Sequence, residues 1–378
     1  MFDYEVLRFV WWALIGVLLI GFAVTDGFDM GVGALVPIIG KTDTERRVMI
    51  NSIAPHWEGN QVWLVTAGGA LFAAWPLVYA ASFSGFYLAM MLTLAALWFR
   101  PVGFDYRSKI EDKRWRSAWD AAIFIGSFVP PIIFGVAFGN LLQGVPFELN
   151  NLMMLKYHGG FFDLLNPFAL VCGLVSSAMF VLQGATWLQM KTTDQIHARA
   201  SKVSMICSAL IIVLFTVAGF WAQSIEGFVI TSVMDHNAPS DPLNKDVIRQ
   251  VGALFLNFKE YPLLWIAPAL AVVMPVIAMI ATKLKKAWVA FIASSLTNAG
   301  VILTSGFALF PFVMPSSLNP DHSLTMWDST SSELTLNIMT VVAVVMVPTI
   351  LAYTAWTYYK MFGRIDTKFV EENKNSLY

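Results

Sequence analysis

The 378-residue chain contains 57% hydrophobic and 13% charged residues, and its formal net charge is −1. Soluble domains carry about 25% charged residues, so this composition predicts an integral membrane protein. The near-zero net charge excludes a generally basic surface, and we predict no nucleic-acid partner.

Apolar segments follow one another along the whole chain, each near the length of about 20 residues that spans the hydrocarbon core as a helix. We predict a single membrane domain over residues 1–378, an all-α integral membrane protein folded as a polytopic bundle of about nine transmembrane helices. The second segment has a polar start, so hydropathy alone also admits eight. The nine segments cover residues 9–36, 53–79, 80–99, 119–142, 164–190, 203–223, 262–282, 287–310 and 334–361.

Lysine and arginine residues are divided unequally between the connections of this bundle. Most of the 24 lie in alternate connections, with the largest groups in residues 100–116 and 360–374. The positive-inside rule places that set of connections in the cytoplasm. With nine helices, the N-terminus is therefore predicted outside and the C-terminus in the cytoplasm.

Two polar clusters interrupt the first two apolar segments, one around Asp26 and Asp29 and the other in Pro55–Leu64. Asp26 and Asp29 lie three residues apart in the first segment and hence on one helix face. An acid inside a bilayer costs roughly 2.5–3.5 kcal/mol on insertion scales, so such residues usually mark function. The polar residues expected to line a site are Asp26, His56, Trp57, Asn60 and Gln61.

The two clusters are expected to lie at the same depth. Asp29 and Glu58 are each about seven residues from the cytoplasmic end of their helices, roughly 10 Å at 1.5 Å per residue. Adjacent antiparallel helices usually pack together, so we expect the clusters to meet, with Glu58, Asn60 and Gln61 facing the first helix. Asp105 follows the third segment and would stand at the cytoplasmic mouth. The arrangement predicts a proton uptake path; the alternative is a static polar pair that specifies helix packing.

Cofactor ligands are sparse in this chain. His56 stands at a helix start and is expected to act as a polar cap or partner rather than as a haem ligand. Cys172 and Cys207 lie in separate apolar segments without metal-ligand or disulfide spacing, and we predict no metal site. Most of the 14 tryptophans are expected at membrane interfaces or in packing, so position alone gives Trp57 and Trp63 no specific role.

Four stretches resemble subunit II of the bacterial cytochrome bd-type ubiquinol oxidases. They are Gly27–Gly31, Pro55–Leu64, Arg100–Arg107 and Phe310–Pro315. The resemblance extends over essentially the whole chain, and the combination of motifs is specific although each is short.

The resemblance implies a function that the residues alone do not. Complexes of this family oxidise quinol on the outer side of the bacterial inner membrane, reduce dioxygen to water and draw the protons from the cytoplasm. Subunit I, an obligate partner, carries the ligands of haem b and haem d, so no catalytic residue is expected in this chain. A bound quinone and a small accessory membrane subunit are further candidates, and membrane lipid surrounds the complex.

The resemblance also implies roles for individual residues. Asp29 matches the proton-path acid of the first helix, and Asp105 matches the acid near the cytoplasmic opening, with Tyr378 expected beside it. Glu58 stands where the family commonly has Asp, which changes the reach of the acid by one methylene. Trp63 matches the indole associated with a lateral oxygen route.

Two other functions remain open from the sequence. A proton-coupled secondary transporter could use Asp29 and Glu58, although no clear internal repeat of the kind common in transporters is present. A purely structural assembly partner could use the same acids only for packing.

Overall fold

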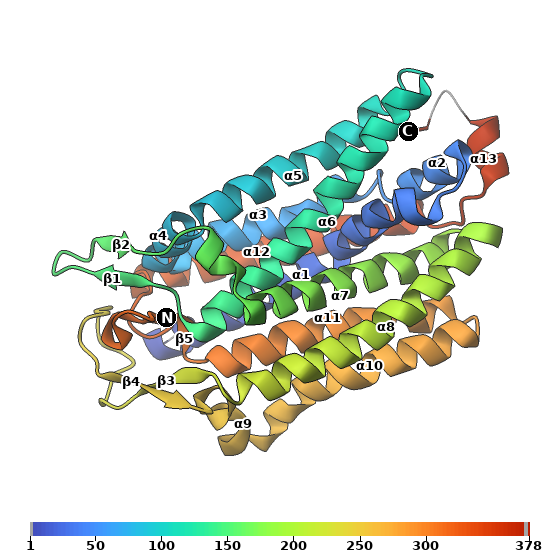
Figure 1. The fold of residues 1–378 in the computed structure, drawn as a ribbon. Helices are drawn as coiled ribbons and strands as arrows, with labels where there is room; N and C mark the ends of the chain where they lie inside the picture. The colour runs from blue at the N-terminus through green and yellow to red at the C-terminus, as the bar shows by residue number, and fades with distance from the viewer. Residues whose placement is uncertain (1–2, 374–376) are drawn as a thin grey trace.

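The computed structural model describes residues 3–373 and 377–378 as a bundle of long helices that run roughly side by side (Figure 1). Within those residues, eight helices are long and apolar enough to cross a membrane, counting the short η3 turn (Pro262–Trp265) with α10. The predicted polytopic all-α membrane bundle is confirmed. The eight are α1 (Tyr4–Ile39), α5 (Tyr87–Tyr106), α6 (Lys113–Gln143), α7 (Pro167–Lys191), α8 (Asp194–Ala222), α10 (Ile266–Lys283), α11 (Ala287–Leu309) and α12 (Glu333–Lys360).

A further long helix, α3 (Trp57–Ala74), lies in the bundle beside α1 and corresponds to the second predicted segment (Figure 1). Its polar first turns keep it below the hydropathy of the other eight, which is why the two counts, eight and nine, diverge. The predicted bounds 53–79 and 80–99 are wrong. The α-helical conformation is disfavoured before a proline, so the helix breaks at Trp75 and a short α4 (Pro76–Gly85) precedes α5.

The connecting segments separate the bundle into two ends. At the end near the N-terminus, which we call the hairpin end, three antiparallel two-stranded hairpins extend from the helices (Figure 1). The C-terminus lies at the opposite end, which we call the α2 end. The hairpin end holds β1 (Phe147–Leu149), β2 (Leu155–Tyr157), η1 (Phe162–Leu165), β3 (Glu226–Ile230), β4 (Val247–Val251), η2 (Ala253–Phe255), α9 (Leu256–Glu260), β5 (Phe312–Met314), η4 (Pro320–His322) and β6 (Leu324–Thr325), and the α2 end holds α2 (Asp43–Asn51) and α13 (Thr367–Glu372).

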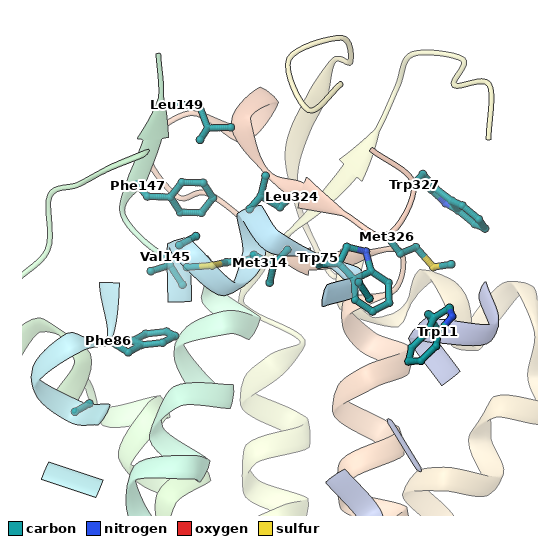
Figure 2. Close-up of a cluster of buried hydrophobic side chains, with 14 of the residues drawn as sticks. Trp11, Trp75, Phe86, Val145, Phe147, Leu149, Met314, Leu324, Met326 and Trp327 are labelled. Atoms are coloured by element: carbon teal, nitrogen blue, oxygen red, sulfur yellow. The ribbon is translucent and has the colours of Figure 1, made fainter. Parts of the chain in front are cut away.

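A hydrophobic cluster closes the break between α3 and α4 at the hairpin end. Trp75 is 1% exposed and lies with Trp11 of α1, Phe86, and Met314 and Leu324 of the β5–β6 hairpin (Figure 2). The side chains come from segments far apart in the sequence. Their burial therefore compensates for the helical hydrogen bonds that are lost at the break.

Close packing of α1 against α7 sets the position of the acids on α1. Gly31 and Gly184 face each other, and a Cβ at either position would overlap the backbone of the other helix. Small residues at a membrane helix crossing allow the two backbones to approach this closely. The segment of α1 that carries Asp29 is consequently held in the interior of the bundle.

We expect Gly184→Ala to destabilise the assembled protein by about 1–3 kcal/mol, because the added methyl group forces the two helices apart. The midpoint of thermal unfolding of the purified protein measures this. Gly219→Ala is the matched control, since open space surrounds that glycine on α8. Equal midpoints for the two variants would show that the crossing tolerates a methyl group.

Candidate functional site

The site is built around the acids of α1. Asp26 and Asp29 are each 0% exposed, and both lie well inside α1 rather than in its first or last turn. Burying a charge is costly unless it is paired and hydrogen-bonded. The partners of these two carboxylates therefore decide what the site can do.

Asp26 forms an ion pair that was not predicted from the sequence. Arg100 Nη2 of α5 lies 2.7 Å from Asp26 Oδ1, and both side chains are 0% exposed. The predicted third helix ended at residue 99, which left Arg100 among the cytoplasmic basic residues. In the structure α5 continues through Pro101 to Tyr106 and carries Arg100 into the bundle. The signal in the sequence is an arginine that directly follows an apolar run, but nothing in the sequence names its partner.

Asp29 has a neutral partner. Asn60 Nδ2 of α3 donates a hydrogen bond to Asp29 Oδ2 over 2.8 Å, and Asn60 is 1% exposed. Tyr358 of α12 in turn donates from Oη to Asn60 Oδ1 over 2.5 Å. The two polar clusters thus meet, as expected from their depth, and Asn60 makes the contact. Tyr358 was not among the predicted residues.

The expectation that Glu58 faces Asp29 is wrong. Glu58 is exposed on the outer face of α3, and Gln61 is half-buried. The reason is helix geometry: residues two apart differ by about 200° around an α-helix with 3.6 residues per turn. The rotation that brings Asn60 to Asp29 turns Glu58 to the outside.

A second group of polar residues lies at the α2 end. Partial burial, together with the carboxylates of Asp105 and Glu58, raises the pKa of the Tyr378 hydroxyl. Asn51 Nδ2 and Arg47 Nε donate to the Tyr378 backbone oxygen over 2.9 and 3.0 Å, and the Tyr378 N–H donates to Asn51 Oδ1. Asp105 is exposed at the end of α5. The structure therefore places Tyr378 within the electrostatic reach of both acids.

The remaining predicted residues pack rather than bind polar groups. His56 makes no side-chain cap hydrogen bond to α3, so the expectation of a polar cap is wrong. The His56 ring instead stacks on the ring of Tyr358, with centroids 4.6 Å apart. Trp57 is half-buried against the hydrophobic cluster at the α2 end. Trp63 is also half-buried and lies against α1, where a Cβ on Gly21 would be 2.5 Å from the indole.

A charged network ties the ends of α2, α5 and α6 together at the α2 end. Asp120 is 2% exposed and binds Arg46 and Arg107, each over 2.6 Å. Asp43 binds Arg107 over 2.9 Å and Arg116 over 2.7 Å. The network joins the end of α5, next to Asp105, to α6 and to α2, the helix that precedes α3.

The described histidines are engaged in contacts within the chain. His56 is 5% exposed and its ring face is covered by Tyr358. The other four make hydrogen bonds near helix ends or in the hairpins. Among the residues that the structure describes, no group of three or more His, Cys, Asp or Glu side chains could hold a metal ion. The four histidines that make these hydrogen bonds are His158, His197, His236 and His322.

Comparisons with known proteins agree over the whole chain. The family described as cytochrome bd terminal oxidase subunit II matches residues 7–361. The chain is 62% identical over 379 residues to cytochrome bd-I ubiquinol oxidase subunit 2 of Escherichia coli K12, with 100% of each chain covered. It is 60% identical over 378 residues to a probable cytochrome oxidase subunit 2 of Haemophilus influenzae, again with 100% of each covered.

More distant similarities have the same extent. Cytochrome bd ubiquinol oxidase subunit 2 of Bacillus subtilis is 31% identical over 362 residues, which cover 95% of this chain and 97% of that protein. A chain in the structure of bd oxidase from Geobacillus thermodenitrificans superposes with a TM-score of 0.58 at 13% identity, covering 96% of this chain and 99% of that one. At that identity the likeness concerns the fold alone.

Proposed function

Because the chain belongs to the family of subunit II of the cytochrome bd terminal oxidase, we propose that it carries protons from the cytoplasm towards its partner subunit. The chain is one subunit of a respiratory quinol:oxygen oxidoreductase, and it works beside a subunit I in a complex with haem cofactors. It is a multi-pass protein of the bacterial inner membrane. The transporter alternative is not favoured, since the relatives are oxidase subunits.

The charge arrangement around Asp29 is the observation that carries the proposal. Arg100 contacts Asp26, whereas Asp29 is contacted by the neutral amide of Asn60. A fully buried carboxylate without its own cation is tolerated as the neutral acid and costly as the anion. Asp29 is therefore suited to take up a proton and pass it on, while the Asp26–Arg100 pair holds a fixed charge beside it.

The proposed path begins at the α2 end, which the basic connections favour as the cytoplasmic end. Asp105, Glu58 and Tyr378 would form its mouth, and Asp29 its interior acceptor. The haem-bearing subunit consumes these protons when dioxygen is reduced to water. Asn60 itself cannot relay a proton, because an amide does not titrate; it holds Asp29 in place.

The outer face of α3 is proposed to pack against subunit I. Glu58 is exposed there, and an acid facing hydrocarbon is costly, so a protein partner is favoured. Gly59, Gly68 and Gly69 have open space around them and would allow a helix of the partner to approach closely. Trp63, half-buried on the same helix, is the proposed wall of a lateral oxygen route.

The finer composition of the complex is part of the same proposal. Haem b and haem d would be held by subunit I, as the resemblance to the family implies. Ubiquinol and dioxygen are the proposed substrates. A bound quinone and a small accessory membrane subunit complete the expected assembly in the lipid bilayer, with the N-terminus outside.

We expect Glu58→Gln to lower quinol-driven oxygen uptake by about tenfold, less than the full 10²–10⁴-fold that a positioned proton carrier contributes, because Asp105 can still supply the mouth. Glu58→Asp should retain activity, since it keeps the carboxyl group. Uptake is measured with an oxygen electrode on complexes of equal haem d absorbance. Unchanged uptake in Glu58→Gln would remove Glu58 from the path.

A further inference from the structure

We propose that Tyr358 is a positioning residue for Asp29, acting through the amide of Asn60. The inference rests on the proposed proton-carrying role of Asp29 and deepens it. The three side chains form one hydrogen-bonded chain across α12, α3 and α1: Tyr358 donates to Asn60, and Asn60 donates to Asp29. Tyr358 is 298 residues from Asn60 in the sequence, so only the fold brings them together.

The amide of Asn60 has one accepting end and one donating end, so a contact at one end orients the other. With Oδ1 bound by the Tyr358 hydroxyl, Nδ2 points at the Asp29 carboxylate. An ionised carboxylate only accepts hydrogen bonds, so this orientation supports the ionised form of Asp29. The reversed amide would present Oδ1, which suits only the protonated acid. Tyr358 thereby sets how readily Asp29 releases its proton.

The ring of Tyr358 is held in a built pocket. It stacks on His56 at 4.6 Å with 8° between the planes, and it meets the edges of Phe28 at 6.3 Å and Trp187 at 6.2 Å. Leu336 is the one fully buried residue among the described residues of α12, so this helix otherwise lies on the outside of the bundle. Tyr358 extends from this outer helix between α1, α3 and α7, and these ring contacts hold its hydroxyl group at Asn60.

The charged and titratable groups around this chain come from four helices. On α1 itself, Asp26 precedes Asp29 by one turn, and Arg100 of α5 contacts Asp26. Behind the phenol lies His56 at the start of α3, and Lys191 Nζ of α7 is 5.2 Å from the centre of the Trp187 ring. Asp26, Arg100, His56 and Lys191 make no hydrogen bond to the Asn60 side-chain amide in the part of the chain described. The amide is therefore held by Tyr358 at its oxygen and by Asp29 at its nitrogen.

The test is the pH dependence of oxygen uptake by the intact complex carrying Tyr358→Phe. Without the hydroxyl, Asn60 Oδ1 loses its donor and the amide can turn over. The Asp29 anion then loses a hydrogen bond, so the carboxyl group stays protonated to higher pH. We expect the alkaline limb of the activity profile to move up by about one pH unit, the size of one hydrogen bond to a charged group. The carboxyl stretching band in infrared difference spectra should shift as well.

Tyr359→Phe is the matched control, because its side chain is 76% exposed on the same helix, and its profile should stay in place. If Tyr358→Phe fails to assemble, Asn60→Leu removes the amide that donates to Asp29 and should give an upward shift of the same direction. No shift in that variant would also overturn the proposal, because Tyr358 acts on Asp29 only through this amide. A profile that stays unmoved in the assembled variant overturns the positioning role.

Asp29→Asn separates the two levels of the proposal. If that variant loses activity while Tyr358→Phe keeps the native profile, proton transfer through Asp29 stands and positioning by Tyr358 fails. If Asp29→Asn keeps full activity, the proton-carrying role fails and the positioning role fails with it.

Discussion

Asp29→Asn is expected to lower quinol-driven oxygen uptake by about 100-fold, within the range that a positioned proton carrier contributes. Asparagine has nearly the same shape as aspartate and can still hydrogen-bond to Asn60, but it cannot bind and release a proton. We expect the haem spectrum of the complex to be unchanged, because the amide keeps the shape and the hydrogen bond of the side chain. Oxygen uptake per unit of haem d absorbance measures the effect.

The control for Asp29→Asn is Glu111→Gln, which neutralises an exposed acid in the connection between α5 and α6. It should keep native activity. Native activity in Asp29→Asn would mean that the buried acid serves only for packing, the third function that the sequence left open. A loss of haem absorbance together with activity would instead give Asp29 a role in assembly.

Arg100→Met is expected to destabilise the complex by about 3–5 kcal/mol, the usual consequence of removing one partner of a buried ion pair. The carboxylate of Asp26 would be left in the interior without its cation, and both side chains are 0% exposed in the native pair. The measurement is the midpoint of thermal unfolding, followed by haem absorbance. Loss of haem absorbance on purification would be the extreme form of the same effect.

The double variant Asp26→Leu with Arg100→Met tests the cause of that loss. Replacing both members of a buried pair by apolar residues is often neutral, so the double variant should recover most of the stability. A double variant as unstable as Arg100→Met would show that Arg100 supports the fold through contacts other than Asp26.

The sequence predicted the membrane bundle and the family because both depend on patterns that are long or specific. Runs of about 20 apolar residues are typical of membrane-spanning helices. The motif around Pro55–Leu64 combines polar and aromatic residues in an unusual order. The family assignment is confirmed by matches over the full length. The helix bounds near Trp75 were less accurate, since a proline break inside a long apolar run leaves the hydropathy unchanged.

The site was predicted only in part, and the reason lies in rotation and in distant contacts. Depth along the helices correctly indicated that the polar clusters of α1 and α3 meet. It could not decide which face of α3 turns inward, so Glu58 was expected to face α1 together with Asn60, and only Asn60 contacts Asp29. Arg100 and Tyr358 come from helices far along the chain, and no local spacing links either residue to α1.

The central claim is that protons reach the complex through Asp29. Its most direct test is proton uptake by the oriented complex in lipid vesicles, followed with a pH-indicator dye on the side of the α2 end while quinol drives oxygen consumption. We expect the native complex and Glu111→Gln to take up protons from that side, and Asp29→Asn to do so about 100-fold more slowly. Equal rates of uptake from that side in Asp29→Asn and the native complex would contradict the central claim.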